Sequence, residues 1–293
     1  MQTQTWYLIF KTMRPRQWTK NLLVFAALIF SRNLFNPVLA QNVIIAFIIF
    51  CILSGSVYTL NDLIDLKADR AHPKKSTRPL ASGKLKPETA IIAGAVLVIL
   101  SLATAFWLHT SFALIALGYF FLQIFYSLVL KHVVILDVLT VATGFVLRAI
   151  AGAEVISVPI SSWLLICTIL LALFLSLGKR RHELLLLEDN AVHHRKILYE
   201  YSPGLLDQMI SVVTASTVVV YALYTMDDVT VKKFQTDNLK YTIPFVLYGI
   251  FRYLYLIHQK SAGGSPERIM FDDKPLLINI ILYLVTVWIF TYS

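Results

Sequence analysis

An acidic cluster follows a long apolar run near residue 60, and residues 61–70 read NDLIDLKADR. Asp62, Asp65 and Asp69 are spaced three and four apart, so they share one face if the helix of the apolar run continues. Like charges on one face repel, and Mg²⁺ removes that cost because it prefers hard oxygen ligands and substrate phosphates. We therefore predict a magnesium site formed by Asn61 and the three aspartates, which are also the predicted catalytic residues. The alternative is a solvated helix end with mixed charges.

Cations follow the acidic cluster directly. Residues 72–75 read HPKK, and Pro73 is expected to end the helix. Lys75 and Arg78 then lie on a loop close to the carboxylates, where they suit an anionic ligand that a metal neutralises only in part. The alternative for each lysine is a topology signal without a role in binding.

Two charged residues fall in a later apolar run. Arg148 lies near its middle, where a charge is costly and indicates function by default. Asp137 begins the same run. Arg148 either contributes to substrate binding or closes the bundle as an ion pair, with Asp137 as one candidate partner. Asp137 is otherwise a candidate for substrate binding.

The composition defines the elements that must position these residues. The chain has 293 residues, of which 57% are hydrophobic and 15% charged, whereas a soluble domain carries about 25% charged residues. The apolar runs are long enough to cross a bilayer and must then be helices. We predict an all-α polytopic membrane bundle of about nine spans in a single catalytic domain, residues 1–293. The expected spans are Trp18–Phe35, Val38–Leu60, Thr89–Leu108, Ser111–Leu130, Leu136–Val155, Ile160–Leu177, Leu205–Met226, Ile243–His258 and Leu276–Phe290.

The net charge of +9 is distributed unevenly over the connecting segments. Most of the 26 Lys and Arg lie on one side of the expected spans. The positive-inside rule then places the N-terminus in the cytoplasm and the C-terminus outside, in the plasma (inner) membrane, with the acidic cluster on the cytoplasmic side. Nucleic acid is not expected as a partner because the basic residues are divided among short loops. The sequence leaves homo-oligomer formation open.

The spacing Asn61-Asp62-x-x-Asp65-x-x-x-Asp69, at the end of the second of nine spans, resembles the first aspartate motif of the UbiA-type prenyltransferase superfamily. The resemblance covers nearly the whole chain. It implies an all-helical bundle with a cytoplasmic cap of loops, and Mg²⁺ as the cofactor that holds a diphosphate leaving group.

The second motif departs from the pattern of the aromatic prenyltransferases in this superfamily. Residues 178–183 read GKRRHE, in the loop expected after the sixth span. Only Glu183 replaces the second set of carboxylates, and three adjacent cations precede it. A substrate with more phosphate than a prenyl diphosphate is therefore favoured.

Six motifs look like the decaprenyl-phosphate phosphoribosyltransferases of this superfamily. They are MRPRQWTKN at 13–21, DRAHP at 69–73, RPLASG at 78–83, YSxxLK at 126–131, GKRRxE at 178–183 and GGSPE at 263–267. The resemblance implies 5-phosphoribosyl 1-diphosphate as donor and a polyprenyl phosphate as acceptor, and a product used to build cell-envelope polysaccharide. The residues expected to bind substrate are Lys20, Asn61, Arg70, Lys75, Arg78, Tyr126, Lys131, Asp137, Arg148, Lys179, Arg180 and Glu183.

Five of these cations are candidates for the C5 phosphate and the acceptor phosphate, and the sequence does not divide them between the two roles. They are Lys75, Arg78, Lys131, Lys179 and Arg180. Two other functions compete with this one. An aromatic prenyltransferase with a polyprenyl diphosphate donor would need a second aspartate-rich loop. A transporter for an anionic metabolite would need polar residues along the middle of several spans.

Overall fold

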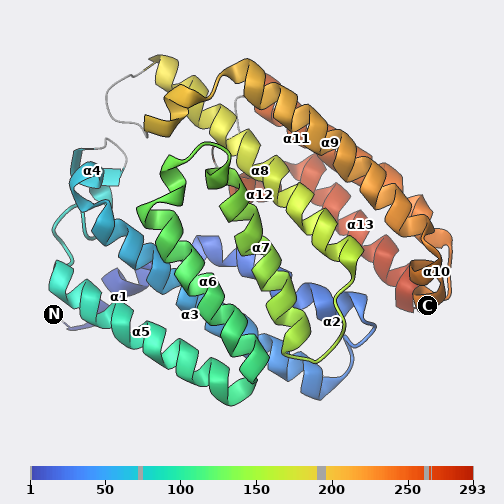
Figure 1. The fold of residues 1–293 in the computed structure, drawn as a ribbon, viewed down its shortest axis with the longest axis horizontal. Helices are drawn as coiled ribbons and strands as arrows, with labels where there is room; N and C mark the ends of the chain where they lie inside the picture. The colour runs from blue at the N-terminus through green and yellow to red at the C-terminus, as the bar shows by residue number, and fades with distance from the viewer. Residues whose placement is uncertain (1, 72–74, 190–195, 261–263, 265, 293) are drawn as a thin grey trace. The chain divides into compact units, whose positions relative to one another are not determined.

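The computed structural model describes residues 2–71, 75–189, 196–260, 264 and 266–292, and these residues form helices and loops without a strand. The chain divides into two compact units, Met1–Ile160 and Ser161–Ser293 (Figure 1). Pro73 and the adjacent His72 and Lys74 lie outside the described residues, as do parts of the GGSPE motif. The expectation of one catalytic domain stays a prediction.

The first unit is built on four long helices. Its elements are α1 Gln2–Thr12, η1 Pro15–Phe25 (a 3₁₀ helix), α2 Ala26–Phe30, α3 Pro37–Ile64, α4 Leu66–Ala71, η2 Lys75–Thr77, α5 Pro87–Leu108, α6 Thr110–Leu128, η3 Leu130–His132 and α7 Leu136–Glu154. Local sequence sets the start of α3. Pro37 occupies its first turn, and the Asn36 side chain accepts hydrogen bonds from the backbone of Val38 and Leu39.

The first expected span is not a single α-helix. Its residues fall in η1, which packs along α3 and α7, and in the five-residue α2. A 3₁₀ helix rises about 2.0 Å per residue and an α-helix about 1.5 Å, so η1 and α2 together cover about 30 Å. That length matches the hydrocarbon core of a bilayer. The segment therefore has the length of a crossing although it is too irregular for one long helix.

Aromatic and small side chains form the core of the first unit. Phe50 of α3 contacts Phe112 and Tyr119 of α6, with ring centroids 5.8 and 5.4 Å apart. Helix α5 instead presents large apolar residues outward, and Trp107 is 82% exposed. Such exposure suits a lipid environment rather than water.

The second unit consists of α8 Ser162–Asp189, η4 Lys196–Glu200, α9 Pro203–Met226, α10 Asp228–Phe234, η5 Asn238–Thr242, α11 Ile243–Gln259, α12 Pro266–Asp272 and α13 Lys274–Tyr292. Helix α8 runs 12 residues past Leu177, the expected end of the sixth span. The predicted loop at Lys179–Glu183 is therefore wrong, since these residues continue the helix. Ion pairs of Glu183 with Lys179 and Arg180 at helical spacing support the extension.

Seven helices in the described part of the chain are long and apolar enough to cross a membrane: α3, α5, α6, α7, α8, α9 and α13. Helix α11 covers the eighth expected span with 17 residues. The prediction of an all-α, multi-pass membrane protein is confirmed.

Candidate active site

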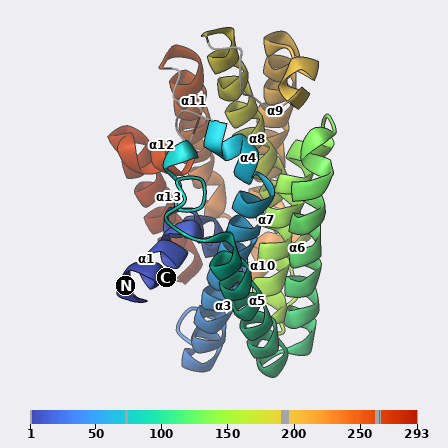
Figure 2. The same ribbon diagram turned by 90° about the vertical axis from the view of Figure 1, so that its left-hand side faces the viewer.

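The acidic cluster lies where α3 passes into α4 (Figure 2). Helix α3 ends at Ile64, and Asp65 adopts φ −87° and ψ 7° before α4 begins. Backbone hydrogen bonds from Asp65 to Asn61 and from Asp69 to Asp65, of 2.9 and 2.8 Å, continue across the break. The chain therefore keeps nearly helical hydrogen bonding across the break.

Asp62 and Asp69 converge on one guanidinium group. Arg78 Nη1 lies 3.0 Å from Asp62 Oδ1 and 2.5 Å from Asp69 Oδ2. Both aspartates are only 2% exposed. Arg14 also binds Asp62, and Lys75 Nζ lies 3.8 Å from Asp69 Oδ1. Because buried carboxylates need compensation, these cations are what allows two aspartates to be buried side by side.

Asp65 does not join this pair. Its Oδ1 accepts a hydrogen bond of 2.8 Å from Lys131 Nζ, which is buried in η3. The expectation that all three carboxylates share one face therefore needs correction. The break at the end of α3 and the cation offered by η3 separate Asp65 from Asp62 and Asp69.

The donor set fits a magnesium ion in a limited way. Among the described residues no three His, Cys, Asp or Glu side chains gather as a metal cluster. Mg²⁺, however, is commonly bound by one or two carboxylates together with substrate phosphates. Asp62 and Asp69 are two hard-oxygen donors that already converge on a cationic group, which satisfies that requirement. The roles of Asn61 and Asp65 as ligands stay predictions.

Arg14 is a site residue that the sequence did not single out for binding. Its backbone has φ 51°, a left-handed conformation that is uncommon for a side chain of this size, and its guanidinium lies 5.0 Å above the Tyr58 ring. The ion pair with Asp62 spans 48 positions in the chain. The available signal was the motif containing Arg14 and Pro15, which resembles the phosphoribosyltransferases.

Arg148 is buried in α7 and is surrounded by neutral partners. It donates to Asn21 Oδ1 at 2.7 Å, Gly144 O at 2.7 Å and Tyr119 OH at 2.8 Å. An ion pair with Asp137 is excluded, because 11 helical residues separate the two by about 16 Å along α7. Asp137 is itself fully buried at the start of that helix.

Other predicted site residues are distributed along the same unit. Asn61 and Tyr126 are half-buried, Lys20 lies on η1 next to Asn21, and Arg70 is exposed on α4. In the second unit, Arg180 is 4% exposed and binds Glu183 Oε2 at 2.5 Å, while Lys179 lies 3.8 Å from Glu183 Oε1. The cations before Glu183 are therefore arranged along a helix rather than a loop.

Comparison with known proteins decides the family. The sequence pattern of the UbiA prenyltransferase family matches residues 22–271. The chain belongs to this family. A decaprenyl-phosphate phosphoribosyltransferase of Mycolicibacterium smegmatis is 34% identical to it over 95% of the chain and 91% of the relative. One of Mycobacterium tuberculosis is 32% identical over 95% and 92%.

Solved structures of UbiA homologues share the fold of this family member. A homologue from Archaeoglobus fulgidus, bound to GPP and Mg²⁺, matches with a TM-score of 0.74 over 98% of this chain and all of that one, at 20% identity. The phosphoribosyltransferase names belong to the relatives, and magnesium belongs to the homologue.

Proposed function

We propose that this UbiA-family protein transfers 5-phosphoribose from 5-phosphoribosyl 1-diphosphate to a polyprenyl phosphate and releases diphosphate. The observation that carries the proposal is the pair of buried carboxylates, Asp62 and Asp69, held among Arg14, Arg78 and Lys75. Carboxylates that bind a metal and cations that bind phosphate then act on the same diphosphate. The relatives that are 32–34% identical to this chain support this donor and acceptor.

Each group has a distinct task in the proposed reaction. Asp62 and Asp69 are the residues that would hold Mg²⁺, and Arg14 and Arg78 would orient the diphosphate at C1 of the ribose. The magnesium ion, when bound, supplies charge neutralisation for the diphosphate. Breaking the bond between C1 and oxygen develops oxocarbenium character at the sugar, as in glycoside cleavage. Asp65 binds Lys131 and positions this lysine for a substrate phosphate.

The acceptor needs no dedicated general base, because a phosphate oxygen is already anionic at neutral pH. Lys131, Lys179 and Arg180 are the cations proposed to receive the C5 phosphate and the acceptor phosphate. Arg180 is our choice for the C5 phosphate, where no bond is broken and direct contact with a cation suffices. Asp137 is the proposed partner of the ribose hydroxyls. The positive-inside distribution of Lys and Arg supports a cytoplasmic position for this chemistry and an extracytoplasmic C-terminus.

One experiment tests the reaction directly. Detergent-solubilised protein is mixed with Mg²⁺, labelled 5-phosphoribosyl 1-diphosphate and a polyprenyl phosphate. Label entering the lipid phase supports the proposal. The second candidate is an aromatic prenyltransferase, since the family description names prenyltransferases without naming an acceptor. Transfer from an allylic diphosphate to an aromatic acid, without phosphoribose transfer, would establish that candidate instead.

A further inference from the structure

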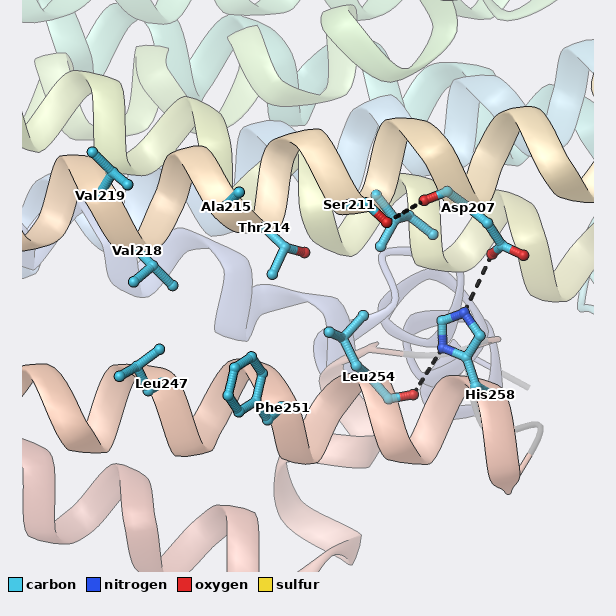
Figure 3. A pocket seen from close by; sticks show the side chains of 11 residues that line it. Asp207, Ser211, Thr214, Ala215, Val218, Val219, Leu247, Phe251, Leu254 and His258 are labelled. Carbon is cyan, nitrogen blue, oxygen red and sulfur yellow. Dashed lines mark hydrogen bonds and ion pairs between the residues drawn. The ribbon is translucent and has the colours of Figure 1, made fainter.

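A groove runs between α9 and α11 in the second unit, and its volume is about 630 Å³ (Figure 3). Most of its lining is apolar and comes from Ala215 and Val218 of α9 and Leu247, Phe251 and Leu254 of α11. Phe251 is 59% exposed. Because α9 is long and apolar enough to cross a membrane, the groove opens on a surface that lipid chains can reach.

Charged side chains close one end of the groove. Asp207 of α9 accepts hydrogen bonds from Arg181 of α8, with Nε at 2.5 Å and Nη2 at 3.4 Å. His258 Nε2 lies 3.2 Å from the same carboxylate, and a dashed line marks this contact in Figure 3. Asp207 lies four residues after Pro203, the first residue of α9. A charged end at this depth corresponds to the level of lipid headgroups.

His258 makes two hydrogen bonds at the charged end of the groove. Nδ1 lies 2.9 Å from the carbonyl oxygen of Leu254, which can only accept, so Nδ1 donates. Nε2 faces the ionised carboxylate of Asp207, which also only accepts. Arg181 and His258 therefore present N–H groups to one carboxylate, and a phosphate at this end of the groove can share these donors with Asp207.

Thr214 supplies a second and independent observation. It is 9% exposed and lines the groove, yet its hydroxyl has no hydrogen-bond partner in the part of the chain that the structure describes. Thr217 and Thr291, which are also buried in this unit, each bind a backbone carbonyl of their own helix, that of Val213 at 2.7 Å and that of Val287 at 2.8 Å. A buried hydroxyl without a partner is costly, so this one is suited to bind a ligand.

We propose that the groove binds an anionic glycerophospholipid. Thr214 lies seven residues after Asp207 on α9, which places it about 10 Å deeper along the helix axis. A glycerophospholipid has its phosphate at one level and its ester carbonyls several ångströms deeper, above the acyl chains. The phosphate meets Arg181 and His258, an ester carbonyl accepts from Thr214, and an acyl chain lies against Leu247 and Phe251.

The chemistry of Thr214 separates this ligand from two others. A polyprenyl phosphate has no oxygen below its phosphate, so it would leave the Thr214 hydroxyl unpaired. A second copy of this chain offers an apolar helix face but no headgroup phosphate to bind the N–H groups of Arg181 and His258. The phospholipid is the ligand that satisfies both the charged end and the buried hydroxyl.

The test uses the full-length protein, stripped of lipid in detergent and titrated with dioleoyl phosphatidylglycerol by native mass spectrometry. Ala215→Trp fills the groove and is expected to remove one saturable lipid site. Thr214→Val keeps the shape of the side chain and is expected to weaken that site about two- to tenfold, the range for one hydrogen bond. The matched controls are Thr217→Val and Val212→Trp on the same helix, which are expected to bind lipid as the original protein does.

Several results would overturn the proposal. Equal lipid binding by the Ala215→Trp variant and the original protein would show that the groove is not the site. If polyprenyl phosphate displaces phosphatidylglycerol with the same affinity in the Thr214→Val variant and the original protein, the groove is assigned to polyprenyl phosphate. If the lipid-free protein is a dimer and Ala215→Trp makes it a monomer, the groove binds a second copy of the chain. Equal affinity for phosphatidylcholine would contradict the preference for an anionic headgroup. Thermal unfolding without lipid verifies that each variant is folded.

Discussion

Arg148 Nε donates a 2.7 Å hydrogen bond to Asn21 Oδ1, although the two residues lie 127 positions apart in the chain. Asn21 completes the link by donating to Ser54 Oγ at 3.1 Å. One amide side chain thus connects η1, α3 and α7 in the centre of the first unit. A buried cation with neutral partners depends on every one of these bonds.

Asn21→Ala is therefore expected to destabilise the protein by about 1.5–3 kcal/mol, the range for a hydrogen bond to a charged group. Thermal unfolding in detergent without substrate measures the loss. Asn33→Ala is the control, because Asn33 is only half-buried and bonds to neighbouring Ser31. A loss for Asn21→Ala no larger than for Asn33→Ala would contradict the structural role.

Close packing of η1 on α7 gives a second prediction. A Cβ added at Gly152 would collide with the carbonyl oxygen of Val24. Gly152→Ala is expected to cost about 1–3 kcal/mol of stability, the usual cost of overpacking. Gly94→Ala and Gly118→Ala are matched controls, since nothing lies within 4 Å of a Cβ at either helical position. They should be neutral or stabilising because alanine favours helices. Gly152→Ala as stable as these controls would disprove the close contact.

Metal dependence is the third prediction. Transfer activity should vanish in chelator and return with Mg²⁺, because the diphosphate needs a cation that Asp62 and Asp69 hold. Transfer should be abolished by Asp62→Ala and by Asp69→Ala. Asp65→Ala should also abolish it, through loss of the ion pair with Lys131. Asp237→Ala is the control, since Asp237 is exposed and pairs with nearby Lys240. Full turnover in chelator would remove the metal from the mechanism.

Donor recognition is the fourth prediction. Arg180→Ala should raise the KM for 5-phosphoribosyl 1-diphosphate about ten- to hundredfold, from the loss of one charged contact. A ribosyl diphosphate without the C5 phosphate should be affected much less. Glu183→Gln removes the ion pair between Arg180 and Glu183 but keeps Arg180, so it tests whether the ion pair alone affects the KM. Arg32→Ala serves as a second control because Arg32 is exposed. Equal losses with both donors would place Arg180 elsewhere in the reaction.

Topology is the fifth prediction. The uneven distribution of Lys and Arg places the region near Lys84 in the cytoplasm and the C-terminus outside. A reporter inserted near Lys84 should read cytoplasmic, and one fused after Ser293 extracytoplasmic. The opposite readings would require a different number of crossings.

Composition and local spacing determined the class of this protein. Apolar runs of bilayer length have one structural solution in lipid, so the helices that cross could be predicted from sequence. The acidic cluster, and its nearby cations Lys75 and Arg78, were also visible because they lie within 17 positions of one another. The irregular η1 was not, because its conformation depends on packing against α3 and α7 rather than on its own sequence.

Only the tertiary structure decided which charges meet. It separated Asp65 from Asp62 and Asp69 by offering it Lys131, which lies 66 positions away. It also brought Arg14 to Asp62 and gave Arg148 neutral partners in place of a carboxylate. Helical periodicity predicts which side chains share a face of one helix. The pairing of a buried charge depends instead on which other helix end or loop packs against it, and that is fixed only when the whole bundle is assembled.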